Sequence, residues 1–300
     1  MEVKKDSFKA WLLAARPKTL TGAAVPVIIG LSLAWADAKL YAGDTFSWVA
    51  AVLCLLFAFI MQIDANFIND FVDYARGTDD RATRLGPERA CTQGWVTIER
   101  MKHVIAATTC LACLVGLPLV WFGGLEMLLV GMICVVFCFL YTTHLSYLGL
   151  GDVLVLVFFG LVPVSITYYI QLHTFTAEVI VASLACGLVI DALLLVNNFR
   201  DRDTDRTAGK QTLVVRIGPK AALWLYLSVG IAACLLGLVF GLNNRWWAFV
   251  LPFAYLLLHT LTFLRMKSIW QGRELNSCLG ATARNILIYG LLVAIGIILS

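Results

Sequence analysis

Residues 176–210 read TAEVIVASLACGLVIDALLLVNNFRDRDTDRTAGK, which is the most informative segment for the fold. Its first part, residues 176–198, is apolar apart from a few isolated polar positions such as Asp191. A helix of about 20 mostly apolar residues is long enough to cross a lipid bilayer. The apolar run then passes directly into a segment rich in Asn and Asp. The stretch therefore predicts a transmembrane helix that ends in a charged segment at one face of the membrane.

Eight further apolar stretches of similar length accompany this one. The full set of expected spans lies near 19–36, 46–66, 103–122, 124–143, 150–172, 176–198, 221–241, 246–265 and 282–299. The chain is 60% hydrophobic and only 14% charged, whereas a soluble domain carries about 25% charged residues. This composition excludes a water-soluble globular protein. We expect an all-α, polytopic membrane protein with nine transmembrane helices.

The basic residues indicate how the chain is oriented. Of the 23 lysines and arginines, all except Lys39 and Arg245 fall in the amino-terminal arm or in every second connection after it. Lysine and arginine are enriched in the cytoplasmic loops of membrane proteins. We therefore expect a protein of the plasma membrane with a cytoplasmic amino terminus. Because topology accounts for much of the net charge of +4, that charge does not indicate a nucleic-acid partner.

Two segments rich in Asp and Asn follow the second and sixth expected spans, near 66–80 and 197–210. The first reads NFINDFVDYARGTDD and the second NNFRDRDTDRTAGK. Side chains four residues apart share one face of a helix. The residues at this spacing are Asn69 and Asp73 in the first segment and Asn197, Asp201 and Asp205 in the second. Since both segments lie at cytoplasmic ends of spans, the two polar faces can meet across a cavity.

These residue types indicate a site for magnesium and diphosphate. Carboxylate and amide oxygens suit hard cations such as Mg²⁺, which proteins usually hold with a few carboxylates together with substrate phosphates. The basic residues that could meet phosphate oxygens are Arg76, Arg81, Arg84, Arg200, Arg202 and Lys210. For either segment alone, solvated loop charges are an equal alternative. The repeated N-x-x-x-D spacing after two spans of the same direction favours Mg²⁺-assisted departure of a diphosphate.

At these residues the sequence resembles the UbiA superfamily of intramembrane aromatic prenyltransferases, which carry two Asp-rich motifs and nine transmembrane helices. The segments that carry the resemblance are Arg16-Pro17-Lys18-Thr19-Leu20, NDFVDYARGTD from Asn69, RLGPERA from Arg84, GLGD at 149–152, and NNFRDRDTDRTAGKQTLVVRIG from Asn197. Within the superfamily, the pattern is most similar to the branch that prenylates 1,4-dihydroxy-2-naphthoate in menaquinone synthesis. The resemblance covers most of the chain and implies one UbiA-type helix bundle, with residues 1–300 as a single domain.

The resemblance also implies roles for individual residues. The metal position is matched by Asn69, Asp70, Asp73, Asp201 and Asp205, of which Asp73, Asp201 and Asp205 are the expected catalytic residues. The residues expected at the diphosphate are Arg84, Asn197, Arg200, Lys210 and, after the fourth span, Tyr141.

Two departures from the family pattern affect this site. Gly77 stands where many relatives have a third acid. Asp79 and Asp80 are the candidates to replace that acid here. Many relatives also have a lysine several residues after the position of Tyr141, and His144 is the candidate for that contact here. At both positions the sequence leaves the contact to the diphosphate open.

The implied reaction joins the polyprenyl group of a polyprenyl diphosphate to 1,4-dihydroxy-2-naphthoate within the membrane lipid, with loss of carbon dioxide and diphosphate. Another aromatic acceptor, such as 4-hydroxybenzoate or homogentisate, is the first alternative. An ion-coupled transporter is the second, but it would place its clustered acids near the middle of the bilayer. Asp64 and Asp191 do lie within apolar sequence. Each is either a contact in the acceptor pocket or a hydrogen-bonded carboxyl inside the bundle, and the second interpretation is favoured.

Overall fold

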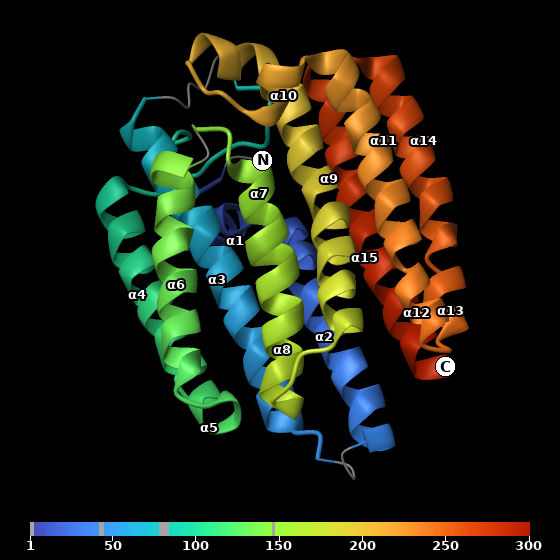
Figure 1. The fold of residues 1–300 in the computed structure, drawn as a ribbon. Coiled ribbons are helices and arrows are strands. Elements are labelled where there is room, and N and C mark those ends of the chain that lie inside the picture. The colour runs from blue at the N-terminus through green and yellow to red at the C-terminus, as the bar shows by residue number, and fades with distance from the viewer. Residues whose placement is uncertain (1–2, 42–44, 78–83, 146–147) are drawn as a thin grey trace.

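The computed structural model describes residues 3–41, 45–77, 84–145 and 148–300, and the regular structure within them is helical (Figure 1). Nine stretches of this described part are long and apolar enough to cross a membrane, and each corresponds to one expected span. They are Phe8–Leu40, Trp48–Ala75, Ile98–Gly123, Glu126–Thr143, Gly151–Leu172, Ala177–Thr207, Pro219–Leu242, Trp246–Ile269 and Arg273–Leu299. The prediction of an all-α membrane protein with nine spans is confirmed.

Several spans are built from more than one helical element. In chain order the elements are α1 (Phe8–Ala15), η1 (Pro17–Thr19), α2 (Leu20–Tyr41), α3 (Trp48–Ala75), α4 (Ile98–Gly116), α5 (Leu119–Gly123), α6 (Glu126–Leu140), η2 (Tyr141–Leu145), α7 (Gly151–Val155), η3 (Leu156–Leu161), α8 (Val162–Leu172), α9 (Ala177–Thr207), α10 (Leu213–Ile217), α11 (Pro219–Leu236), α12 (Leu238–Leu242), α13 (Trp246–Val250), α14 (Phe253–Ile269), η4 (Arg273–Leu275) and α15 (Asn276–Leu299). Elements η2 and η3 are π-helical turns, which are frequent at functional sites. They flank α7, the short helix that begins in the GLGD segment.

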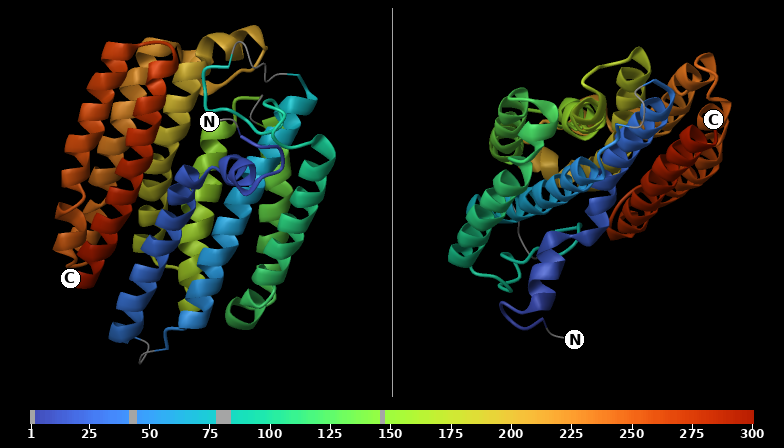
Figure 2. Two further views of the ribbon diagram at one scale, coloured as in Figure 1. Left: turned by 180° about the vertical axis from the view of Figure 1, so that it is seen from behind. Right: turned by 90° about the horizontal axis from the view of Figure 1, so that it is seen from below.

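The helices form one bundle, and the two chain ends lie toward opposite ends of it (Figure 1). An odd number of spans requires this placement. Helix α2 is central, since it contacts α3, α8, α9 and α15. Figure 2 shows that α1 runs across the bundle axis instead of along it.

Helices α3 and α9 are the longest in the described chain, and each carries one acidic motif at its end. With 28 and 31 residues, they reach about 42 and 46 Å at 1.5 Å per residue. The hydrocarbon core of a bilayer is only about 30 Å thick. Ser47 and Thr176 cap their first turns by accepting hydrogen bonds from the backbone amides of Ala50 and Val179. The surplus length places both motifs on one side, beyond the apolar layer.

Gly77 explains why the first motif lacks the third acid. It follows the end of α3 with φ of +66°, in the left-handed region of backbone conformation. A side chain with a Cβ rarely adopts this conformation, so residue 77 turns the chain instead of extending the helix. The candidates Asp79 and Asp80, together with Arg81 and the side chain of His144, lie outside the described residues.

Asp64 on α3 is a buried acid with 0% exposure. The hydroxyls of Thr108 and Thr109 on α4 donate hydrogen bonds to its two carboxylate oxygens. This confirms the interpretation of Asp64 as a hydrogen-bonded carboxyl inside the bundle. It joins two helices through hydrogen bonds that satisfy both of its buried oxygens.

A second buried network lies at the end of the bundle opposite the two motifs. Arg245 forms ion pairs with Asp37 of α2 and with Glu178 of α9, the latter at 3.1 Å. The hydroxyl of Tyr168 also donates to Asp37, at 2.6 Å. Arg245 therefore neutralises buried carboxylates and is not an exposed loop charge.

Candidate active site

A cavity of about 1180 Å³ inside the bundle brings the two motifs together. Nine of the predicted site residues line it: Asn69, Asp73, Arg84, Tyr141, Asn197, Arg200, Asp201, Asp205 and Lys210. Much of the remaining wall is apolar and includes Phe57, Met61, Val135, Phe158 and Ile166. The cavity thus combines charged groups from the motif ends with an apolar body inside the membrane-spanning part.

The first motif enters the cavity from the end of α3. The hydroxyl of Thr142 donates a hydrogen bond to Oδ1 of Asn69 at 2.5 Å. Nη1 of Arg89 lies 2.5 Å from Oδ2 of Asp73 and donates to the backbone carbonyl of Asn69, also at 2.5 Å. These contacts hold both side chains at the cavity wall, on the single helix face that their spacing predicts.

Asp70 has a different environment, although it is next to Asn69 in the sequence. It is 0% exposed, and its carboxylate oxygens accept hydrogen bonds from the backbone amides of Ala90 and Cys91 at 2.8 and 3.0 Å. It does not belong to the described wall of the cavity. Neighbouring helical residues point about 100° apart, so Asp70 cannot share the face of Asn69. Its contacts anchor the segment after α3, and its expected role at the metal stays a prediction.

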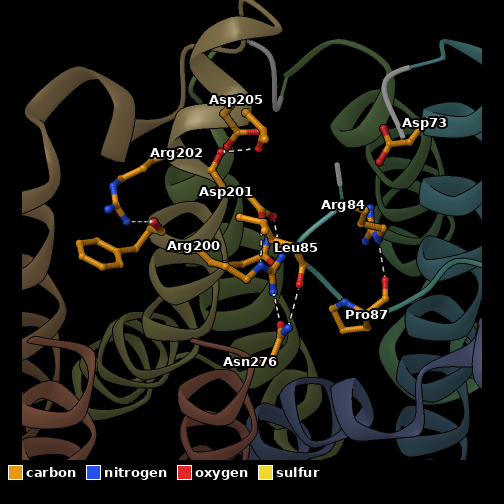
Figure 3. A network of polar contacts seen from close by, with 12 residues as sticks. Asp73, Arg84, Leu85, Pro87, Arg200, Asp201, Arg202, Asp205 and Asn276 are labelled. Atoms are coloured by element: carbon orange, nitrogen blue, oxygen red, sulfur yellow. Dashed lines mark hydrogen bonds and ion pairs between the residues drawn. The ribbon is translucent and has the colours of Figure 1, made fainter. Parts of the chain in front are cut away.

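Arg200 organises the second motif (Figure 3). Its side chain is 2% exposed, and its Nε and Nη2 donate to the two carboxylate oxygens of Asp201 at 2.8 and 2.5 Å. It also donates to Oδ1 of Asn276 at 2.9 Å and to Oδ1 of Asn197 at 2.8 Å. The amide of Asn276 in turn donates to the carbonyl of Leu85 at 2.8 Å. This network joins α9, α15 and the segment after α3, and it fixes the orientation of Asp201.

Asp205 carries a carboxylate oxygen that is available to a ligand. Its Oδ1 lies 3.8 Å from Nζ of Lys210. Its Oδ2 is buried and has no hydrogen-bond partner in the part of the chain that the structure describes. A buried oxygen without a partner is costly, so a cation or a donor is expected there. Asp201 and Asp205 lie on one side of the view in Figure 3, and Asp73 lies on the other.

The basic residues divide into two groups. Arg84 lines the cavity, and its Nε donates to the carbonyl of Pro87 at 2.6 Å. Arg76 and Arg202 do not contribute to the described cavity wall. Arg202 donates to the carbonyl of Phe199 at 2.6 Å and lies 4.5 Å from the centre of that ring. Neither residue belongs to the described wall, so phosphate contacts from Arg76 and Arg202 stay a prediction.

Arg16 is a cavity residue that the sequence reasoning missed. It lines the wall with a backbone φ of +50°. Its Nη2 is buried and finds no hydrogen-bond partner among the described residues. The available signal was the Arg16-Pro17-Lys18 segment, to which no role was assigned. Asn276, which orients Arg200, gave no signal because it lies far from both motifs in the sequence.

Tyr141 begins η2 and lines the cavity next to α7. A Cβ built on Gly151 would lie 3.9 Å from the Tyr141 hydroxyl and 3.3 Å from Leu194 of α9. A Cβ at position 151 would require Leu194 to shift by a few tenths of an ångström, so Gly151 lets α7 and α9 pack closely. Asp152, the last residue of the GLGD segment, also lines the cavity, although the sequence reasoning gave it no role.

Comparison with known proteins decides the family. Residues 24–278 match the UbiA prenyltransferase family. The chain belongs to the UbiA prenyltransferase family. Membership of the UbiA family removes the transporter alternative, because the match covers most of the chain and both acidic motifs.

Relatives of this UbiA chain include proteins named 1,4-dihydroxy-2-naphthoate octaprenyltransferase. The protein of that name from Escherichia coli (strain K12) is 35% identical over 305 residues, which cover 97% of this chain and 96% of the relative. The one from Mycobacterium tuberculosis (strain ATCC 25618 / H37Rv) is 34% identical over 292 residues, with 96% of each chain covered. The similarity therefore extends over nearly the full length of both proteins.

Solved structures share the UbiA fold at low sequence identity. The apo structure of a UbiA homolog from Aeropyrum pernix K1 has a TM-score of 0.68 at 18% identity, covering 91% of this chain and 97% of that one. A UbiA homolog from Archaeoglobus fulgidus, bound to GPP and Mg²⁺, has a TM-score of 0.67 at 16% identity, with coverage of 95% and 99%. The predicted UbiA-type bundle is thus confirmed.

Proposed function

We propose that this UbiA protein transfers a polyprenyl group from a polyprenyl diphosphate to 1,4-dihydroxy-2-naphthoate, with release of diphosphate and carbon dioxide. The acceptor is supported by the relatives, whose names state that activity and whose similarity spans nearly the whole chain. The observation that carries the chemistry is the cavity in which both acidic motifs meet an apolar interior. A substrate with a charged diphosphate and a long hydrocarbon tail needs both environments at once.

The residues at the cavity fit a Mg²⁺ ion held jointly with the diphosphate. The ligands would be Asn69, Asp73, Asp201 and Asp205, and the buried, unpartnered Oδ2 of Asp205 is the strongest indication. Within the described residues, no three His, Cys, Asp or Glu side chains form a metal cluster of their own. Phosphate oxygens would complete the octahedral shell that Mg²⁺ requires. Bound Mg²⁺ would neutralise the charge that develops on the departing diphosphate.

The protein's own residues bind and orient the diphosphate end. Arg84, Arg200 and Lys210 supply positive charge at the wall, and Arg16 adds a guanidinium nitrogen without a partner. Because Arg200 holds Asp201 through two hydrogen bonds, that carboxylate keeps its orientation during the reaction. Groups fixed in advance stabilise developing charge without a reorganisation cost. The apolar wall takes the isoprenoid tail and keeps water from the reactive allylic carbon.

The acceptor ring supplies the electrons for the new bond. Its two hydroxyl groups make it electron-rich, so the carboxyl-bearing carbon can attack C1 of the isoprenoid. The bond from C1 to the diphosphate oxygen breaks as the new carbon–carbon bond forms. Loss of the carboxyl group as carbon dioxide then restores aromaticity.

We further propose that residues 1–300 form one prenyltransferase domain in the plasma membrane, with the amino terminus and the site on the cytoplasmic side. The distribution of basic residues supports this orientation. Arg245 is buried in an ion network, which leaves Lys39 as the exposed basic residue of the described chain at the opposite face. A cytoplasmic site would receive the soluble naphthoate directly and the isoprenoid tail from the bilayer.

The test uses the purified protein with a polyprenyl diphosphate, Mg²⁺ and carboxyl-labelled 1,4-dihydroxy-2-naphthoate. Label should leave as carbon dioxide in an amount equal to the prenylated product and to the diphosphate released. Retention of label in the product would contradict the decarboxylating step. If only 4-hydroxybenzoate or homogentisate is prenylated, the acceptor is wrong, while the diphosphate and metal assignments stand.

A further inference from the structure

Asn276 is the first residue of α15, and it joins two parts of the site that are far apart in the sequence (Figure 3). Its Oδ1 accepts a hydrogen bond from Nη1 of Arg200 at 2.9 Å, and its Nδ2 donates to the carbonyl oxygen of Leu85 at 2.8 Å. Leu275, which precedes it, is 0% exposed and packs in the same buried cluster as Phe199, the residue before Arg200. This packing holds Asn276 next to the second motif.

The side-chain amide of Asn276 suits both of its contacts. A guanidinium offers only donors and a carbonyl offers only an acceptor, so the side chain between them must accept and donate at once. Asn does both, whereas Asp would lack the donor for Leu85 and Ala would lack donor and acceptor. The two contacts also fix the orientation of the amide, because the reverse orientation would face a donor with Arg200 and an oxygen with the carbonyl of Leu85.

Arg200, the first partner of Asn276, has little freedom to move. Its four hydrogen bonds, to Asp201, Asn197 and Asn276, use four of the five N–H groups of a guanidinium. Gly86 lies directly against this group, because a Cβ built on Gly86 would be 2.7 Å from Nη2 and 3.1 Å from Cζ of Arg200. A lost hydrogen bond or an added side chain at position 86 would therefore displace the group that orients Asp201.

Residues 84–89 form one continuous segment that contacts both motifs, and we call it the bridging segment. All six of its residues line the cavity. Near its start, the carbonyl of Leu85 is tied to Asn276, and the next residue lies against Arg200. At its end, Nη1 of Arg89 lies 2.5 Å from Oδ2 of Asp73. The bridging segment thus spans the distance between the acids of the first and the second motif.

We propose that Asn276 is a positioning residue that sets the separation of the two motifs for a jointly held Mg²⁺ and diphosphate. It acts on Asp201 through Arg200 and on Asp73 through the bridging segment. This inference rests on the proposed function and names the residue that aligns the two halves of its metal site. Mg²⁺ demands near-ideal octahedral geometry with oxygens at about 2.1 Å. Ligands from two different helices meet this demand only where other groups hold the helices' side chains at a fixed separation.

The test measures the Mg²⁺ concentration that gives half-maximal binding of geranyl diphosphate to the purified protein. Loss of a group that orients metal ligands costs about 10- to 100-fold in metal affinity. In Asn276→Ala the required Mg²⁺ concentration should rise by about that factor, while kcat at saturating Mg²⁺ changes less, because no ligand is removed. Ser277→Ala is the matched control. Ser277 follows on the same helix, donates to the carbonyl of Glu274 at 2.6 Å and lies outside the described cavity wall, so its Mg²⁺ requirement should be that of the unaltered protein.

Two further variants test the route by which Asn276 acts. Gly86→Ala removes no hydrogen-bonding group, but its methyl would press on the Arg200 guanidinium, so the Mg²⁺ requirement should rise here as well. Arg89→Gln removes the ion pair with Asp73. Combined with Asn276→Ala, it should raise the Mg²⁺ requirement by less than the product of the two single fold-changes, because residues that act through one element are not independent.

Thermal unfolding of the same preparations separates this role from a purely structural one. A lower Tm in Asn276→Ala with an unchanged Mg²⁺ requirement overturns the inference. Where Asn276→Ala does not fold, an unchanged Mg²⁺ requirement in Gly86→Ala overturns it instead. Fold-changes that multiply in the double variant also overturn it, because Asn276 would then act on the second motif alone.

Failure of the proposed function gives a different result. If the unaltered protein binds geranyl diphosphate equally well without Mg²⁺, the metal assignment and this inference are both wrong. If the unaltered protein shows Mg²⁺-dependent binding but does not prenylate the naphthoate, the proposed acceptor is wrong. A raised Mg²⁺ requirement in Asn276→Ala then still supports the positioning role.

Discussion

Replacement of Asp205 by Asn should separate the chemistry of the second motif from its contribution to folding. Oδ2 of Asp205 is buried without a partner in the described structure, and Oδ1 lies 3.8 Å from Nζ of Lys210. The two side chains are 27% and 13% exposed, and loss of this long, partly exposed ion pair costs about 1 kcal/mol. The neutral amide returns up to the desolvation cost of the buried oxygen that lacks a hydrogen-bond partner, about 1–3 kcal/mol. The free energy of unfolding of Asp205→Asn should therefore equal or exceed that of the unaltered protein.

The rate should change in the opposite direction. Loss of one preorganised electrostatic contact to a developing charge lowers kcat by about 100- to 1000-fold, or about 2.7–4 kcal/mol of activation free energy. Asp203→Asn is the matched control, because Asp203 lies on the same helix but outside the described cavity wall. Its carboxylate accepts a hydrogen bond from Gln271 at 3.2 Å. This control should keep the rate of the unaltered protein.

The rate and the stability of each variant can be measured on the same preparations. Naphthoate prenylation at saturating Mg²⁺ and substrates gives kcat, and thermal unfolding in detergent gives Tm. A normal rate in Asp205→Asn would refute the assignment of its free oxygen to the metal. A rate and a Tm that fall together in Asp205→Asn, with both unchanged in Asp203→Asn, would show that the side chain supports the fold instead.

Three further outcomes are expected. EDTA should abolish turnover in membranes and Mg²⁺ or Mn²⁺ should restore it, because the proposed ion would be held jointly by protein and phosphate oxygens. Full turnover in stripped membranes would exclude such an ion. Asp70→Ala should lower Tm, since it leaves two buried backbone amides without acceptors at about 1–3 kcal/mol each; an unchanged Tm with a lost Mg²⁺ response would return Asp70 to the metal site. Arg245→Met should destabilise by about 3–5 kcal/mol, because two buried carboxylates lose their cation. Lys39→Met, at an exposed position, should keep its Tm, and equal effects of both changes would contradict this account.

The number of spans, the two polar helix ends and the faces that they present could all be predicted from the amino-acid sequence. These features depend on local properties. Whether an apolar run can span a bilayer depends on its own length. Side chains four residues apart share a face in any helix. For the same reason the sequence placed Asn69 and Asp73 together, and likewise Asp201 and Asp205. The resemblance to UbiA proteins also followed from contiguous segments.

The group that lies opposite each helix face could be identified only from the packed bundle. Helical periodicity predicts the direction of a side chain but not the distant segment that it meets. Asp70 contacts the segment that carries Ala90, and Arg200 is held by Asn276. Asp191, which the sequence favoured as a hydrogen-bonded carboxyl inside the bundle, is buried, and its Oδ1 has no hydrogen-bond partner in the described structure. Partners separated by 20 to 76 residues come together through helix packing, and packing depends on the whole bundle and not on any single segment.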